Sequence, residues 1–319
     1  MKPNKININN LFYIFITSHL IIWTLVPTLT NHNLPLDTIE ALAWGSNLDW
    51  GYNKHPPASA FFIEVFYQIF GSNDWSYYLL SQIFVIISFF FVWKLSEEFF
   101  DSKIYCLLSV LLLEGIHYYN FTTPEYNVYI SELPFWALTV YFAWKSYKQN
   151  SIISWVLLGV FSAIGLLSHY LFIYLLIGIG IFFLYEIYKY KKFNFKYFIS
   201  DIIFLIIILP HLFWLVENDF VTLTYGMHRT GFDSSNYLSH FVQPLIFITK
   251  QIGILIPVII MCLFIFLKFK SKFNLKDKKL FFLICINIFP IFFLILTFPI
   301  ALIFWTIQLI MFDVSRRTI

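Results

Sequence analysis

The sequence is short of charged residues and of cysteine, and both deficits restrict the class of protein. Only 12% of the 319 residues are charged, whereas soluble domains carry about 25%. The three cysteines, Cys106, Cys262 and Cys285, all lie in apolar runs, and no Cys-x-x-Cys pair occurs. An odd number of thiols in such runs gives no disulfide framework and no indication of a cysteine metal site. We expect all three to be packing residues.

Apolar residues are abundant instead, and they form long runs. Hydrophobic residues make up 59% of the chain, and the mean hydropathy is +0.74. Several runs reach roughly 20 residues, the length that crosses a bilayer core. The formal net charge is only +3, with the basic residues scattered over short loops, so nucleic-acid binding is not expected. The composition predicts an all-α protein that spans the membrane many times.

About ten spans can be placed from the lengths of the apolar runs. The first follows a polar N-terminus, but its apolar part is too long for a signal peptide, so we expect it to be retained. The predicted spans are 11–30, 75–95, 104–119, 127–146, 152–168, 170–188, 198–216, 250–268, 280–296 and 297–312.

The basic residues predict the orientation of these spans. With the N-terminus in the cytoplasm, 18 of the 21 Lys and Arg residues fall in inner segments. Only Lys54, Arg229 and Lys250 then lie outside or at the outer interface. Because short cytoplasmic loops carry an excess of Lys and Arg, we expect a plasma-membrane protein with its large loops, 31–74 and 217–249, on the outer side.

The first outer loop contains a segment that suits an interfacial helix. Residues 57–70 are too few to cross a membrane, and their apolar residues recur at helical spacing. Glu64 and Gln68 share the opposite face. We therefore predict an amphipathic helix lying along the membrane surface.

The same loop holds two acidic residues that are open to two interpretations. Asp37 and Glu40 are three residues apart, which matches a capping box at the start of a helix. The spacing fits equally well a carboxylate aimed outside the first span, where it could act as a general base on an acceptor hydroxyl. The spacing alone does not choose between them.

A few residues could stabilise a leaving phosphate or line the same cleft. Lys54, His55 and Arg229 are the candidates for phosphate contact, although Arg229 could equally be an exposed loop charge. Glu132 lies within a predicted span, where carboxylates usually face a cavity or a partner, and could line a cleft with Glu125.

Three further residues invite simpler interpretations, and metal binding stays open. Glu114 can be a residue near the outer end of a short helix, and His169 at a tight turn is typical of a structural histidine. His211 follows a proline inside a span, and we expect it to be a packing or hydrogen-bonding residue. The hard ligands Asp37, Glu40, His55 and Glu125 leave a divalent cation possible, but no metal motif of fixed spacing occurs.

Several segments together resemble a known family. PLDTIEALAWG and LDWGYNKHPP in the first loop, then FGSNDWSYYLLSQ, NFTTPEYNVYISELPFWALTVYFAW, GLLSHY and LPHLFWLVENDFVTLTYGMHR, are similar to bacterial glycosyltransferase family 39-like proteins. These are relatives of the dolichyl-phosphate-mannose protein mannosyltransferases and the aminoarabinose lipid A transferases, which have the GT-C fold. The resemblance covers most of residues 10–260.

The resemblance implies a polytopic enzyme that transfers a sugar, with inversion, from a polyprenyl-phosphate carrier. It implies Asp37 and Glu125 as the acidic site residues, with Glu40 in place of a glutamate that many members carry beside the aspartate. Many members have Lys where this chain has His169, which places that residue among the donor-binding candidates and would make its charge depend on pH.

We therefore expect a single GT-C-like domain over residues 1–319 that uses Asp37, Glu40 and Glu125 for catalysis. The acceptor would be lipid A, another glycan or a protein, at the outer face of the bacterial inner membrane. Family members usually continue further, so we also expect a C-terminal part of the family to be missing. Two alternatives stay open: a flippase or transporter for lipid-linked sugars, and an inactive remnant of the enzyme.

Overall fold

The computed structural model describes residues 7–229, 239–266, 277–293 and 295, and their secondary structure is entirely helical. The helices are α1 (Ile8–Thr30), α2 (Leu36–Gly45), α3 (Ala58–Phe70), α4 (Asp74–Phe99), α5 (Lys103–Leu111), η1 (Leu112–Gly115), η2 (His117–Tyr119), α6 (Val128–Gln149), α7 (Ile152–Ser168), η3 (Tyr170–Phe172), α8 (Ile173–Tyr190), α9 (Tyr197–Glu217), α10 (Val221–Arg229) and α11 (Ser239–Phe266). A further helix occupies 278–293.

Long apolar helices form the body of the protein, as predicted. Five helical stretches in the described residues are long and apolar enough to cross a membrane: Ile8–Thr30, Asp74–Phe99, Tyr170–Tyr190, Tyr197–Glu217 and Pro244–Leu263. Many of their large apolar side chains are exposed on the protein surface, as expected where lipid is the solvent. The prediction of a polytopic all-α membrane fold is confirmed.

The third predicted span, 104–119, is wrong as a single helix. Only α5 and η1 form a continuous helical run there, and Ile116 is extended before the short η2. The 13 residues from Lys103 to Gly115 would extend only about 20 Å at 1.5 Å per residue, less than the roughly 30 Å of a bilayer core. The predicted run was already short, and the chain turns before its end.

The other predicted spans correspond to helices wherever the structure describes them. The run at 250–268 begins earlier than predicted, because α11 starts at Ser239, and 280–296 corresponds to the helix over 278–293. The last predicted span, 297–312, lies outside the described residues.

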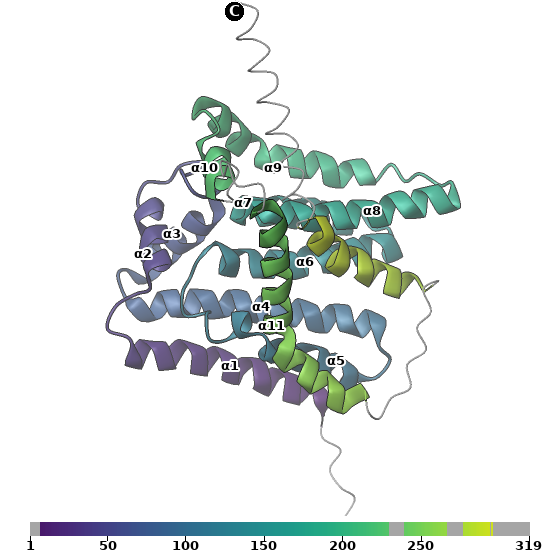
Figure 1. Cartoon of the computed structure of the whole chain (residues 1–319), viewed down its shortest axis with the longest axis horizontal. Coiled ribbons are helices and arrows are strands. Elements are labelled where there is room, and N and C mark those ends of the chain that lie inside the picture. Colours follow the sequence, from purple (N-terminus) through teal and green to yellow (C-terminus); the bar gives the residue numbers. More distant parts are fainter. Residues whose placement is uncertain (1–6, 230–238, 267–276, 294, 296–319) are drawn as a thin grey trace, which may run out of the picture.

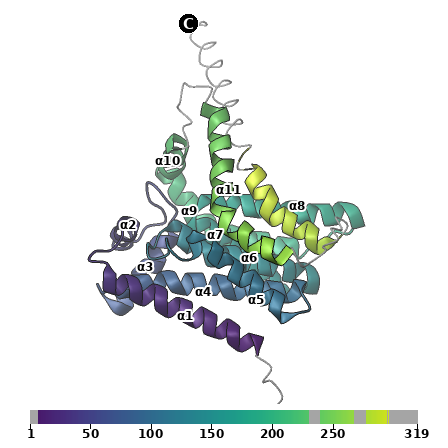
Figure 2. The same cartoon turned by 60° about the horizontal axis from the view of Figure 1, so that its bottom comes forward.

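Two ends of the bundle differ in character. α1, α4, α6 and α7 lie side by side, and α2, α3 and α10 gather at one end of them (Figures 1 and 2). The opposite end holds ion pairs between lysines and glutamates, among them Lys148–Glu98 at 2.5 Å and Lys278–Glu186 at 3.3 Å. The end with α2 and α3 is named the loop end below.

The predicted amphipathic helix is present at the loop end. α3 starts at Ala58 after Pro57 and ends at Phe70, within one residue of the prediction, and the Gln68 amide donates to the Glu64 carboxylate on its polar face. Ala60 and Ile63 are fully buried on the other side. Ile63 packs in the main core cluster beside Tyr77 of α4 and Ile130 of α6, so α3 is fixed to the bundle.

Close helix packing fixes the core that supports this end. α7 packs against both α6 and α9. At the α7–α9 contact, a Cβ on Gly159 would lie 2.5 Å from the carbonyl oxygen of Ser200. Real Cβ atoms do not come so near an oxygen, so glycine is needed for the two helices to approach. The helices behind the loop end therefore form a rigid support for it.

Candidate functional site

The first turn of α2 presents an exposed carboxylate. α2 begins at Leu36, its N-cap is Pro35, and no side chain caps it. The capping-box interpretation of Asp37 and Glu40 is therefore wrong, because Asp37 lies inside the first turn. Asp37 is exposed, and a negative charge there is stabilised by the positive end of the helix dipole. The side chain is thus free of a capping role and open to solvent.

The second acidic segment is joined to this turn. The backbone N–H of Asp37 donates to Glu125 Oε1 at 3.2 Å, and the hydroxyl of Thr38 donates to the carbonyl of Tyr126 at 3.2 Å. The two segments are 88 residues apart in the chain. The sequence predicted that they face the same side, and the structure brings them into direct contact.

Tyr126 connects the same segment to α3. It is fully buried, and its hydroxyl donates to the carbonyl of Ser59 at 3.1 Å. Burial raises the pKa of Tyr126 far above the usual value for a phenol, with a hydrogen bond from Ser131 acting in the opposite direction. The phenol therefore keeps its proton at physiological pH and stays a donor.

The basic candidates of the first loop lie close to α2. Lys54 Nζ forms a short ion pair with Glu40, and both side chains are about one-third exposed. The ring of His55 meets Trp44 of α2 edge-on, with centroids 5.7 Å apart. A partly exposed pair of this kind contributes little to stability, about 0–1 kcal/mol, but it holds the ammonium group of Lys54 beside α2.

A buried pair from two long helices lies next to His55. Glu132 of α6 and His169 at the end of α7 are each about nine-tenths buried, and Glu132 Oε2 lies 2.9 Å from His169 Nδ1. The ring of His169 contacts those of Tyr129 and His55, with centroids 4.9 and 6.3 Å apart. His169 thus joins the candidate donor-binding residues in space, and Glu132 fixes its orientation.

The rest of the first loop is fastened to α9 and α10. The Trp50 carbonyl oxygen lies 2.5 Å from His211 Nδ1, and the hydroxyl of Thr222 donates to the Tyr52 carbonyl at 2.5 Å. Between these bonds Gly51 lies flat on Trp214, since a Cβ there would be 2.3 Å from the indole ring. The loop is therefore held on two sides, by α2 and by α9.

Arg229 is the remaining candidate, and Glu114 lies elsewhere. α10 ends at Arg229, whose side chain is outside the described residues. Glu114 pairs with His19 of α1 rather than with the first loop. In the part of the chain that the structure describes, no three His, Cys, Asp or Glu side chains are grouped as metal ligands, so these residues alone do not build a cation site.

Sequence reasoning missed several residues that shape this site. The Glu132–His169 pair, Tyr129 and Thr222 came only from the structure. His211 was expected to be a packing or hydrogen-bonding residue, which the structure confirms, and it adds the Trp50 carbonyl as the partner. A carboxylate inside an apolar run did indicate that Glu132 has a partner. Nothing in the sequence identified His169 as that partner, because the two belong to different helices and are 37 residues apart.

Part of the chain matches a known protein family. Residues 54–214, about half of the chain, match the family described as dolichyl-phosphate-mannose-protein mannosyltransferase. The match begins at Lys54 and includes Glu125, Glu132 and His169, while Asp37 precedes it.

One curated relative adds to this match. The chain is 24% identical over 241 residues to the lipopolysaccharide core galacturonosyltransferase RgtB of Rhizobium johnstonii. The aligned part is 75% of this chain and 49% of the relative, so the chain spans about half the length of that protein. No solved structure matches the chain. The matched region, together with the polytopic helical fold, shows that the chain belongs to the dolichyl-phosphate-mannose-protein mannosyltransferase family.

Proposed function

We propose that this protein is an inverting glycosyltransferase that uses a polyprenyl-phosphate sugar as its donor. The acceptor is a lipid, a glycan or a protein at the outer face of the bacterial inner membrane, and the N-terminus is cytoplasmic. The observation that carries the proposal is the contact between the first turn of α2 and Glu125. That contact gathers two acidic segments at one end of a membrane-spanning bundle.

Asp37 is the general base in this proposal. Its exposed carboxylate takes the proton from an acceptor hydroxyl, whose oxygen attacks the anomeric carbon of the sugar. The bond from that carbon to the phosphate oxygen breaks, and its electron pair leaves with the polyprenyl phosphate. General-base catalysis of this kind contributes about 10²–10⁴-fold to the rate. Glu125 supports Asp37 by accepting its backbone N–H.

The phosphate needs positive charge or hydrogen-bond donors as it leaves. Lys54 supplies an ammonium group held beside α2 by Glu40, and His55 and His169 lie in contact next to it. Arg229, at the end of α10, is the further candidate. In this account Glu40 positions Lys54 and does not touch the reacting atoms, which refines its expected catalytic role.

The named relative gives a first sugar and acceptor to test. It is a galacturonosyltransferase of the lipopolysaccharide core, so galacturonic acid and a core oligosaccharide are the first choices for this chain. The candidate site lies at the loop end of the bundle. The paired lysines of α5, α6 and the helix over 278–293 lie at the opposite end. Because lysines favour the cytoplasmic side, this supports a site on the outer side.

The experiment is a transfer assay with the full chain in lipid nanodiscs. The donor is polyprenyl-phosphate galacturonic acid labelled in the sugar, and the acceptor is lipopolysaccharide core. The proposal expects labelled core and free polyprenyl phosphate in equal amounts. If galacturonic acid is not transferred, the same assay with other sugars on the same carrier tests whether the protein transfers any carrier-linked sugar.

Two outcomes would contradict the proposal. Movement of the intact labelled carrier between bilayer leaflets, without cleavage, would identify a flippase. No cleavage of any carrier-linked sugar would indicate an inactive relative of the enzyme.

A further inference from the structure

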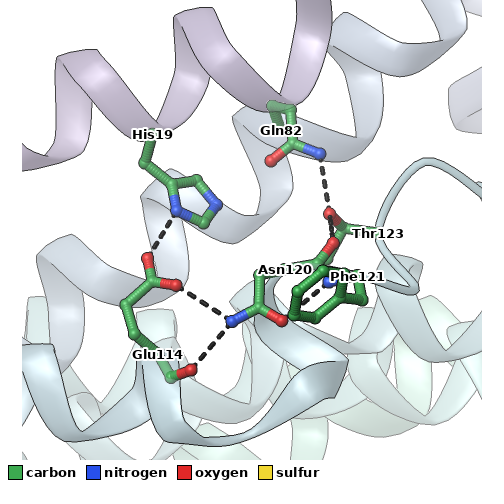
Figure 3. Close-up of polar contacts among 6 residues, drawn as sticks. All are labelled: His19, Gln82, Glu114, Asn120, Phe121 and Thr123. Atoms are coloured by element: carbon green, nitrogen blue, oxygen red, sulfur yellow. Dashed lines mark hydrogen bonds and ion pairs between the residues drawn. The ribbon is translucent and has the colours of Figure 1, made fainter. Parts of the chain in front are cut away.

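A second polar cluster lies beside the candidate site, inside the bundle. It contains His19 of α1, Gln82 of α4, Glu114 of η1, and Asn120 and Thr123 of the segment that leads to Glu125 (Figure 3). The cluster shares no residue with the candidate site. Its hydrogen bonds follow two routes, and both end on the segment from Asn120 to Thr123.

The first route starts at α1. His19 is 4% exposed, and its Nδ1 lies 2.6 Å from Glu114 Oε1. The other carboxylate oxygen of Glu114 accepts from the Asn120 side-chain amide at 3.0 Å, and the Glu114 carbonyl accepts from the same group at 2.9 Å. Asn120 Oδ1 then accepts the backbone N–H of Phe121 at 2.7 Å. The Asn120 side chain is thus held by three hydrogen bonds (Figure 3).

The second route starts at α4 and uses one hydroxyl twice. The side-chain amide of Gln82 donates to Thr123 Oγ1 at 2.9 Å, and the Thr123 hydroxyl donates to the Asn120 carbonyl at 2.6 Å. Both Gln82 and Thr123 are fully buried. The Thr123 hydroxyl therefore connects a transmembrane helix to the turn that contains Asn120.

The cluster is costly if its only purpose is stability. His19 Nε2 and Gln82 Oε1 are buried and have no hydrogen-bond partner among the described residues. A buried polar atom without a partner destabilises the fold, and apolar residues of the same shape would often serve the core as well. The hydrogen bonds that the cluster does form hold the groups that they join in one arrangement. These bonds are therefore best explained by the geometry that they impose.

The segment from Asn120 to Glu125 is also hydrogen-bonded to Asp37. The turn bonds Thr123 N–H to Asn120 O at 3.0 Å and Glu125 N–H to Thr122 O at 3.2 Å make the segment compact. Glu125 then accepts the backbone N–H of Asp37. A chain of hydrogen bonds thus connects Asn120 and Thr123, through Glu125, to the first turn of α2.

We propose that Gln82, Asn120 and Thr123, backed by the His19–Glu114 pair, are positioning residues for sugar transfer. They act through Glu125 on the first turn of α2 and hold the Asp37 carboxylate at the place where the acceptor hydroxyl arrives. This inference rests on the proposed function. None of these residues touches the sugar or the phosphate.

The test removes the hydroxyl of Thr123 with little change in shape, in Thr123→Val. Misplacement of a catalytic group by about 1 Å can cost about 100-fold in rate, so we expect kcat to fall at least tenfold while the KM for the donor changes less than twofold. Thr123→Ser keeps both hydrogen bonds and should restore kcat to within threefold of the wild type. The assay uses the full chain with polyprenyl-phosphate galacturonic acid, or whichever carrier-linked sugar the wild type moves.

The matched control is Thr139→Val. Thr139 is fully buried in α6, and its hydroxyl has no hydrogen-bond partner among the described residues. It should keep wild-type kcat. Equal losses in Thr123→Val and Thr139→Val, or no loss in Thr123→Val, would overturn the proposal.

Amide hydrogen exchange separates this inference from the proposed function, because it needs no substrate. Exchange at the start of α2 should accelerate in Thr123→Val but not in Thr139→Val, and unchanged exchange would overturn the positioning role. Accelerated exchange together with normal transfer by Asp37→Asn would leave the structural link in place and overturn the function assigned to Asp37. In the Glu125→Leu background, which removes the oxygen that accepts the Asp37 N–H, Thr123→Val should cost little more, because both changes act on the same link.

Discussion

At the scale of single residues, the buried partners of the site carry more weight than its exposed charges. Glu132 and His169 are each about nine-tenths buried, and Glu132 Oε2 lies 2.9 Å from His169 Nδ1. The side chains of Lys54 and Glu40 are about one-third exposed. Water screens the second pair but not the first. Removing one buried partner leaves the other without a hydrogen bond. The free energy lost when that group left water is then not compensated.

His169→Leu is therefore expected to destabilise the protein by about 1–3 kcal/mol, because it leaves the Glu132 carboxyl unpaired. It should also lower transfer, because His55 loses a neighbour. Thermal unfolding in detergent measures the first effect. The control is His32→Leu, at an exposed position between α1 and α2, and it should unfold like the wild type. Equal unfolding temperatures for the two variants would show that the pair is unimportant.

At the scale of elements, the first loop depends on α9 as much as on α2. Gly51 lies against the indole of Trp214 between hydrogen bonds from His211 and Thr222. Any side chain at position 51 must move either the loop or the tryptophan. Because Lys54 and His55 follow Gly51 by three and four residues, this contact also restricts their positions.

Gly51→Ala should displace the loop from α9 and lower transfer at least tenfold. Trypsin cleavage after Lys54 should become faster, because the loop leaves its support. Gly180→Ala in α8 is the control, since a Cβ there has no atom within 4 Å. Cleavage and transfer at wild-type rates in Gly51→Ala would mean that the loop does not need this contact.

At the scale of the whole molecule, the account requires the loop end to lie outside the cytoplasm. Asn47, in the first loop, and Lys192, between α8 and α9, are both exposed and lie on opposite sides in the proposed topology. The native Cys106 and Cys285 are buried and Cys262 is half-buried, so their background labelling should be low.

Asn47→Cys should react with a membrane-impermeant maleimide in intact spheroplasts, and Lys192→Cys only after lysis. The wild-type chain measures the background. The reverse pattern would invert the topology and contradict the outer site.

The sequence was informative about this molecule wherever lipid dictates the pattern. The apolar lengths of α1, α4 and α9 and the amphipathic spacing of α3 follow from solvation by a bilayer, so they could be predicted. The end of the helical run after η1 could not be predicted, since η1 places Glu114 beside His19, a partner 95 residues away. Asp37 and Glu125 were predicted to share a side, yet their hydrogen bond depends on how the helices pack. Residue contacts between distant elements are a tertiary property, and a single sequence does not contain them in readable form.

The transfer rate of Asp37→Asn tests whether Asp37 is the general base. The substitution keeps the size of the side chain and removes its basicity, while the backbone N–H that Glu125 accepts remains. Asp49→Asn changes another exposed carboxylate of the same loop and should transfer sugar at the wild-type rate. Loss of a general base should lower kcat about 10²–10⁴-fold in Asp37→Asn. Full transfer activity in Asp37→Asn would contradict the account.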